Sequence, residues 1–271
     1  MSPLWRDEIG AYLTPKRILL VRMKRGMRPQ LEREECHEQT AAAGSWAEAL
    51  SLYQGQLDTG QWGNAAARVV LADQWVRYTV LPWSDTLSAP AERQAHAREL
   101  MSDIFGSSMS NWSVTLSLAP PGASCLASAI PTGLLEALKE LAARYGQKLI
   151  TVQPQLIAAF NTWRHVLPDD AAAWFVTVEE GSLAALRLAR QGIDRVHAVR
   201  IGADWARELK RLQTFGRLAS ASPNDGRVYV DLPIALRGLR PESGAGLEWL
   251  DEPNPPVTTL HQLEYLRRKA A

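Results

Sequence analysis

The chain has 271 residues, 46% hydrophobic and 22% charged, and its 30 basic and 29 acidic residues leave a net charge of +1. This balance gives no electrostatic reason to expect nucleic acid or an anionic membrane surface as a partner. We find no apolar run long enough to cross a bilayer, no signal-peptide core, and no disulfide framework in Cys36 and Cys125, so we expect a cytoplasmic globular protein.

The first part of the chain is predicted to alternate strands with helices. We expect an amphipathic lead-in at residues 4–12, a strand at 17–23 and a polar, edge-like strand at 30–37. A helix at 46–57 and a β-hairpin at 68–81 follow. Ser45 is predicted to cap the helix, because its hydroxyl can accept from a free backbone N–H of the first turn. The hairpin is expected to turn at residues 72–74, either as an exposed β-turn with one packed tryptophan or as a contact with a partner protein.

The middle of the chain continues the alternation. We predict a helix at residues 90–105, followed by two paired strands at 112–118 and 124–130. A helix at 133–145, a short buried strand at 148–152 and a helix at 155–166 come next. Thr132 is predicted to cap the helix at 133–145. Pro154 opens the last helix, which would connect two lobes.

A second hairpin is expected at residues 174–188, with Glu179-Glu180-Gly181-Ser182 in its turn. Val176 and Val178 are predicted to share one face with Leu186 and Leu188. The chain then continues with a strand, a helix capped by Asp204, and a short strand, over residues 196–201, 205–219 and 227–231. Prolines and glycines concentrate over residues 237–256, which indicates a linker or irregular tail, and residues 258–269 could form an amphipathic helix.

Hairpins that alternate with helices, twice over, predict an α/β protein of two similar lobes, with mixed sheets flanked by helices. The order of strands and helices resembles that of the ribonuclease-H-like and actin-like group. We expect a first lobe over residues 1–152 with a hairpin insertion at about 68–131, a second, reduced lobe over 153–233, and a linker with a C-terminal helix over 234–271.

Three passages resemble the actin-like cytoplasmic platform proteins of type IV pilus assembly and type II secretion systems. They are RVVLADQWVRYTVLPW at 68–83, ASAIP at 127–131 with its helix, and KLITVQPQLIA at 148–158, and the hairpin at 174–188 follows in the expected order. The resemblance spans roughly residues 9–231. It implies an actin-like ATPase fold.

The same resemblance implies where a nucleotide would bind. In family members that bind ATP, two hairpin turns carry Asp-x-Gly, whose glycine lets backbone N–H groups approach phosphate and whose aspartate holds hydrated magnesium. Here Tyr12 and Thr14 stand at the first turn, and Thr177 and Glu179 at the second, beside Gly181. Asp231-Leu232-Pro233 replaces the glycine-rich adenosine turn. We therefore predict that no cofactor binds; the alternative is ATP with magnesium, held by divergent phosphate loops.

Other candidate sites are weighed on their residues. Glu179 and Glu180 could be paired carboxylates, although a solvated hairpin tip is the reading we favour. A ribonuclease-type nuclease would need three or four carboxylates on its metals, and the strand at 17–23 offers none. The five histidines are scattered, without metal-ligand spacing. Asp73, Trp75, Arg77 and Trp83 are candidates for contact with a partner protein.

The prediction for function is a non-catalytic scaffold, because all three nucleotide motifs depart from the family pattern. By resemblance it would lie in the cytoplasm, attached to the inner membrane through a partner, and bind a cytoplasmic segment of an inner-membrane assembly protein or another assembly subunit. One alternative is an actin-like ATPase. Another is a dimer that associates through strand edges or the tail.

Overall fold

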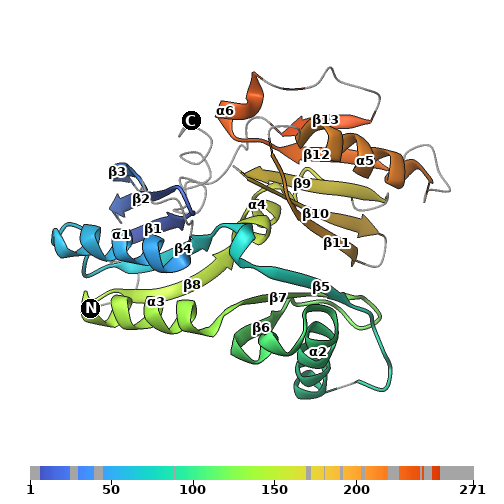
Figure 1. Cartoon of the computed structure of the whole chain (residues 1–271), viewed down its shortest axis with the longest axis horizontal. Helices are drawn as coiled ribbons and strands as arrows, with labels where there is room; N and C mark the ends of the chain where they lie inside the picture. Colours follow the sequence, from blue (N-terminus) through green and yellow to red (C-terminus); the bar gives the residue numbers. More distant parts are fainter. Residues whose placement is uncertain are drawn as a thin grey trace.

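Two five-stranded mixed sheets with the same strand order form the framework of the protein (Figure 1). The computed structural model describes residues 7–24, 30–39, 45–87, 89–168, 172–179, 181–189, 192–202, 205–218, 226–238, 240 and 246–250. In each sheet the first three strands form an antiparallel meander, and the next two run parallel to the first. The repeated topology confirms the predicted α/β fold of two similar lobes.

The first sheet has the order β3-β2-β1-β4-β8. Its strands are β1 (Glu8–Leu13), β2 (Arg17–Lys24), β3 (Gln30–Glu38), β4 (Ala66–Leu71) and β8 (Lys148–Pro154). β1 lies at the centre and is buried over its whole length. The predicted amphipathic lead-in at 4–12 is therefore wrong over the residues the structure describes, because the polar start of this strand, Glu8, is itself buried and paired with Arg68.

The second sheet has the order β11-β10-β9-β12-β13. Its strands are β9 (Ala173–Glu179), β10 (Ser182–Ala189), β11 (Gly192–Arg200), β12 (Arg227–Asp231) and β13 (Leu247–Leu250). β13 pairs in parallel with β12, so four residues of the predicted irregular tail are a strand. Residues 258–269, where a last helix is predicted, lie outside the described residues, and the proposed lobe boundaries stay a prediction.

The hairpin of β9 and β10 forms as predicted, but with a different register. Val178 lies opposite Leu183, and Val176 lies opposite Ala185, whereas Leu186 lies opposite Phe175. The strands are joined at Glu179 and Ser182 by a two-residue loop, which fixes this pairing. A shift of one residue transfers side chains to the other face, and Leu186 accordingly packs in a different cluster from Val176.

A small third sheet is inserted between β4 and β8. It contains β5 (Arg77–Leu81), β7 (Cys125–Pro131) and β6 (Trp112–Leu116) in the antiparallel order β5-β7-β6, and α2 (Pro90–Phe105) packs on it. The predicted hairpin at 68–81 is wrong, because β4 is paired with β1 on one side and β8 on the other. No edge of β4 is free for β5, and the chain instead leaves β4 through a short 3-10 helix, η2 (Asp73–Trp75).

The remaining helices cover the sheets. α1 (Trp46–Asp58) and α3 (Thr132–Arg144) share a core with the first sheet, and α5 (Trp205–Leu218) shares one with the second. Between the sheets, α4 (Gln155–Trp163) follows β8 and packs against β9 (Figure 1). The short helices η3 (Ser107–Asn111) and α6 (Ile234–Arg237) complete the elements. Among the described helices, none has both the length and the apolar character needed to span a membrane.

Two of the three predicted helix caps can be compared with the structure, since Asp204 lies outside the described residues, and these two differ in outcome. Ser45 caps α1: its hydroxyl accepts from the backbone N–H of Glu48 at 3.3 Å, and the Glu48 carboxylate accepts from the Ser45 backbone N–H at 3.2 Å. At α3 the N-cap position belongs to Pro131, which has no side-chain cap bond, and Thr132 is already the first helical residue. The predicted cap at Thr132 is therefore wrong.

These two residues give a matched test of the helix ends. Ser45→Ala should lower the free energy of unfolding by about 1 kcal/mol, because it removes a reciprocal capping pair. Thr132→Ala should change it by less than about 0.5 kcal/mol. Urea denaturation followed by far-UV circular dichroism measures both, and an equal effect of the two substitutions would contradict the assignment of the caps.

Candidate functional site: the cleft between the lobes

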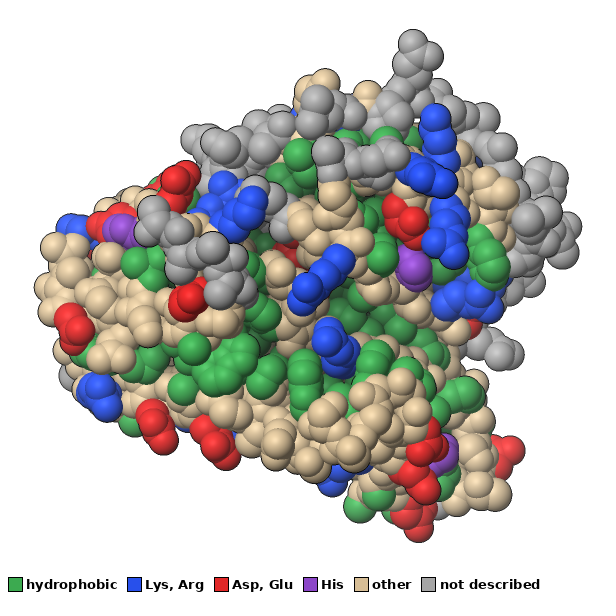
Figure 2. All heavy atoms as spheres, viewed as in Figure 1, with side chains coloured by type: hydrophobic (Ala, Val, Ile, Leu, Met, Phe, Trp, Pro, Cys, Tyr) green, Lys and Arg blue, Asp and Glu red, His purple; other side chains and the backbone are tan. Residues whose placement is uncertain are grey.

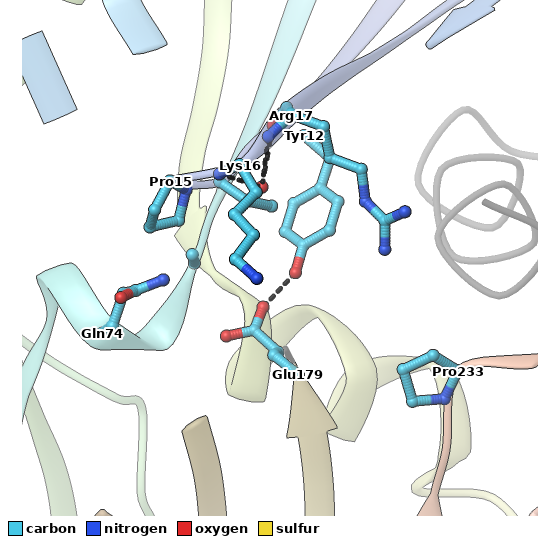
Figure 3. Close-up of a pocket in the computed structure, with 9 residues that line it drawn as sticks. Tyr12, Pro15, Lys16, Arg17, Gln74, Glu179 and Pro233 are labelled. Carbon is cyan, nitrogen blue, oxygen red and sulfur yellow. Dashed lines mark hydrogen bonds between the residues drawn. The ribbon is translucent and has the colours of Figure 1, made fainter. Parts of the chain in front are cut away.

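The central strands of the two sheets, β1 and β9, end at the same place between the lobes. Tyr12 lies near the end of β1, and its hydroxyl donates a hydrogen bond to Oε1 of Glu179, the last residue of β9 (Figure 3). Tyr12 is only 3% exposed and Glu179 only 6%. This contact closes the cleft between the lobes, and the reading of Glu179 as a solvated hairpin tip is therefore wrong.

The carboxylate of Glu179 accepts hydrogen bonds from three elements. Besides Tyr12, its Oε2 atom accepts from the backbone N–H of Asp73 at 2.9 Å and from the hydroxyl of Ser182 at 3.1 Å. Each of these bonds is donated to the carboxyl group, which is the arrangement that satisfies an ionised carboxylate. Glu179 thus connects β1 and η2 of the first lobe with the β9–β10 hairpin of the second.

Asp73 extends the network from η2 to the helix between the lobes. Its Oδ1 atom accepts from the hydroxyl of Tyr78 at 2.5 Å and from the backbone N–H of Leu156 at 3.0 Å, and the Thr177 hydroxyl lies 3.4 Å from Oδ2. Leu156 is in the first turn of α4, where backbone N–H groups have no partner within the helix. Asp73 therefore caps α4 from another element and places negative charge at the positive end of the helix dipole.

Tyr78 is held as a neutral donor in this network. Burial, reinforced by the neighbouring carboxylate of Asp73, raises the pKa of the Tyr78 phenol well above its ordinary value. The phenol therefore keeps its proton across the physiological range and can always donate to Asp73. The hydrogen bond from Tyr78 to Asp73 therefore keeps its donor at neutral pH.

Little space remains beside these side chains. A pocket of about 30 Å³ is lined by Tyr12, Thr14, Pro15, Lys16, Arg17, Ala72, Gln74, Glu179 and Pro233. The ammonium group of Lys16 points toward the Glu179 carboxylate (Figure 3). A water molecule needs roughly 10–15 Å³ on this measure, so the pocket has room for about two waters, whereas ligand sites usually measure about 300–1,000 Å³.

The structure brings the predicted phosphate-loop positions together. Tyr12, Thr14 and Glu179 line the pocket, and Thr177 is buried below it. The Thr14 hydroxyl accepts from the backbone N–H groups of Lys16 and Arg17, so it belongs to the β1–β2 turn. Gly181 has φ +89°, which a glycine adopts without strain, and Glu180 lies outside the described residues.

At the predicted adenosine position the chain is closely packed. Asp231 is fully buried at the end of β12, Leu232 is buried beside it, and Pro233 lines the cleft pocket. No glycine-rich turn follows β12, because Pro233 leads directly into α6. Among the described residues, no group of three or more His, Cys, Asp or Glu side chains is placed to hold a metal ion.

The predicted partner-binding residues separate into two kinds. Asp73 and Trp75 are buried, so the exposed β-turn expected there is wrong. Arg77 lies over the rings of Phe105 and Trp112, 6.0 and 5.4 Å from their centres. Trp83 is partly exposed and donates its indole N–H to Asp85 at 2.9 Å. A partner role for Arg77 and Trp83 stays a prediction.

The sequence analysis did not predict that Asp73 has a central role in the hydrogen-bond network of the site. One signal was available: Asp73 follows the apolar run Val69–Ala72, and the carboxyl ends of parallel strands are where open α/β sheets place their functional groups. Tyr78 and Ser182 gave no comparable signal. Their roles depend on contacts that the folded chain makes between separate elements.

The buried carboxylate can be tested against an exposed one in the same sheet. Glu179→Ala should lower the free energy of unfolding by about 1–3 kcal/mol, because it leaves buried donors without an acceptor. It should also speed hydrogen exchange at the Asp73 amide, which donates to Glu179. Glu248→Ala removes a surface carboxylate that contacts Arg227 and should change neither quantity measurably. Equal effects of the two substitutions would show that the cleft contact does not hold the lobes together.

No protein-family model matches the chain, and no curated protein sequence matches it. Solved structures do match. The cytoplasmic domain of EpsL, an inner-membrane component of the type II secretion system of Vibrio cholerae, has 13% identity and a TM-score of 0.57, covering 96% of this chain and 94% of that one. A chain of the PilM–PilN type IV pilus biogenesis complex has 15% identity and a TM-score of 0.65, covering 90% and 88%.

A third match is a Bacteroides thetaiotaomicron protein with an actin-like ATPase fold and unknown function. It has 12% identity and a TM-score of 0.61 and covers 97% of this chain and 96% of that one. The three matches share one architecture over nearly the whole length of the chain. They show that this chain has the actin-like ATPase fold and is similar in structure to cytoplasmic EpsL and to PilM.

Proposed function

We propose that the protein is a non-catalytic scaffold of a pilus-assembly or secretion platform, and that it binds a peptide segment of an inner-membrane partner or another assembly subunit. The fold supports this proposal, since two of the similar structures belong to a type II secretion system and to a type IV pilus complex. The hydrogen bonds in the cleft support the non-catalytic part.

The observation that carries the proposal is the set of contacts around Glu179. Side chains from both lobes meet where the resemblance implies that a nucleotide would lie, and they leave space for about two waters. A triphosphate would have to break these bonds and face a carboxylate. At an effective dielectric constant near 20, each pair of like charges 4 Å apart costs about 4 kcal/mol. The closed cleft therefore does not need a nucleotide to keep its shape.

The partner in this proposal is a cytoplasmic segment of an inner-membrane protein. EpsL is an inner-membrane component, and PilM is found in complex with PilN. The protein would then work in the cytoplasm and be recruited to the membrane by that segment. Trp83, between β5 and α2, and Arg77 are the proposed contacts, because aromatic and arginine side chains are enriched in interfaces.

An actin-like ATPase is the second candidate. Two features of the cleft favour it: Lys16 points toward the pocket, and Gly181 gives the opposing turn a backbone that phosphate could approach. A nucleotide would then bind after the lobes separate and the bond between Tyr12 and Glu179 breaks.

Titration calorimetry with ATP and magnesium separates these two candidates. The full chain should give no binding heat at nucleotide concentrations up to about 1 mM, the weakest binding that is usually of interest. Lys16→Ala is the control that locates any binding. Micromolar affinity that Lys16→Ala weakens would overturn the scaffold proposal and establish a nucleotide site in the cleft.

Capture of a membrane partner tests the scaffold itself. The immobilised protein should enrich an inner-membrane protein from detergent-solubilised inner membranes, and Trp83→Ala should reduce the yield because it removes an anchoring aromatic side chain. Ile150→Ala, on the exposed side of β8, is the matched control and should leave the yield unchanged. Equal capture by the wild-type protein and Trp83→Ala would exclude this surface.

A further inference from the structure

The second lobe contains a cavity that the cleft contacts do not involve. It has a volume of about 160 Å³ and is lined by Trp174, Arg195, Val196, His197, Glu208, Arg211, Leu212 and Phe215. These residues come from β9, β11 and α5. A cavity of about 150 Å³ with apolar walls accommodates a benzene ring, so one aromatic or large aliphatic side chain fits here.

Trp174 lines the cavity with a ring that is almost wholly buried. Trp174 is 1% exposed, and its indole Nε1 has no hydrogen-bond partner among the described residues. Buried tryptophan N–H groups usually find an acceptor, and leaving one without any costs free energy. Because this N–H group is not accessible from the cavity, Trp174 contributes only apolar ring surface to the wall.

The rim of the cavity is basic and aromatic. The guanidinium of Arg195 lies 4.7 Å from the centre of the Phe215 ring, which is 43% exposed. Arg211 is on the same side of α5 and is also exposed, 3.7 Å from the carboxylate of Glu208. Figure 2 shows Lys and Arg side chains gathered around one histidine in this part of the face.

The acidic residue in the wall is already bound. Glu208 contacts His197, with 2.9 Å between Oε1 and Nε2, so that both side chains are held between α5 and β11. The carboxylate is only 16% exposed, whereas the Arg211 side chain is 75% exposed. The charge that this rim presents to solvent is therefore positive.

We propose that the cavity is a binding site for an acidic peptide segment, in which one apolar side chain enters the cavity and flanking carboxylates bind Arg195 and Arg211. Guanidinium groups bind carboxylates in two parallel hydrogen bonds, which suits both arginines. Leu212 and Val196 supply the apolar walls, and Phe215 covers the bound side chain.

This site is independent of the role in a secretion or pilus platform. It depends on the shape and charge of the second lobe alone, and on no residue of the cleft. An acidic segment is favoured over a basic one because the exposed groups on the rim are guanidinium groups. It is favoured over a free carboxylate because the cavity also has apolar walls of the size of one side chain.

The probe is a capped, labelled pentapeptide, Asp-Glu-Phe-Glu-Asp, added to the full chain and followed by fluorescence anisotropy. We expect saturable binding, and we expect the double variant Arg195→Gln/Arg211→Gln to weaken it about tenfold, as two exposed ion pairs would. Arg227→Gln removes an exposed arginine of β12 that pairs with Glu248 and does not line the cavity, and it should leave the affinity unchanged.

Two further peptides test the specificity. Replacing the central Phe with Gly, or the acidic residues with Lys, should each abolish measurable binding, because the first removes the side chain for the cavity and the second reverses the charge. In a ¹H–¹⁵N spectrum the indole resonance lost in Trp174→Phe should shift when the acidic peptide is added to the wild-type protein. This readout places the bound peptide at the cavity.

Several results would overturn the proposal. They are equal binding of the lysine peptide, no effect of the double arginine variant, and an unmoved Trp174 indole resonance at saturation. A peptide of residues 251–271 that binds more tightly than the acidic probe would assign the cavity to the chain's own C-terminal segment instead. Dissociation of a self-associated form by the acidic probe, seen by light scattering, would assign it to a second copy of the chain.

Discussion

One buried carboxylate connects the ends of the two central strands through hydrogen bonds. Glu179 accepts hydrogen bonds from β1, from η2 and from its own hairpin, and so connects residues as far as 167 positions apart in the sequence. A buried charge is tolerated only where donors compensate for its lost hydration, and here three donors do so. The position of η2 then fixes Asp73, and through it the first turn of α4. The closed form of the cleft follows from these polar contacts.

The two sheets explain why such a contact can form. Each has a central strand that carries an antiparallel meander on one side and parallel strands on the other. The carboxyl ends of β1, β4, β9 and β12 therefore meet in the space between the lobes, where a functional site of an open α/β sheet is expected. In this chain the same location is filled by Tyr12, Asp73 and Glu179. The fold thus provides a position for ligand chemistry, and the residues at that position use it for internal contacts.

Much of the architecture could be predicted from sequence, because it depends on local periodicity and on the order of elements. The helix after Ser45, the hairpin at 174–188 and the strand at 227–231 are of this kind. β1 was missed because Glu8 gives it a polar start, and β13 because glycine and proline surround it. The false hairpin at 68–81 arose because two neighbouring apolar runs show no sign of belonging to different sheets.

The site was harder to predict than the fold. The resemblance located Tyr12, Thr14, Thr177 and Glu179 at the cleft, but it gave no indication that Tyr12 and Glu179 bind each other. Asp73 was misassigned because its neighbours in the sequence identify it only as a polar residue that follows a strand. Its partners, Leu156 and Thr177, are more than 80 positions away, and a single sequence contains no signal for such pairs.

The capping of α4 by Asp73 also limits how the protein can bend. β8 ends at Pro154 and α4 begins at Gln155, without an intervening loop. The covalent connection between β8 and α4 is therefore short and allows little change in their relative orientation. A hinge at this joint would pull Leu156 away from Asp73 and expose the positive end of the helix. Separation of the lobes would therefore remove the cap of one helix in addition to breaking the contacts of Glu179, and the loss of that cap would add to the free energy of opening.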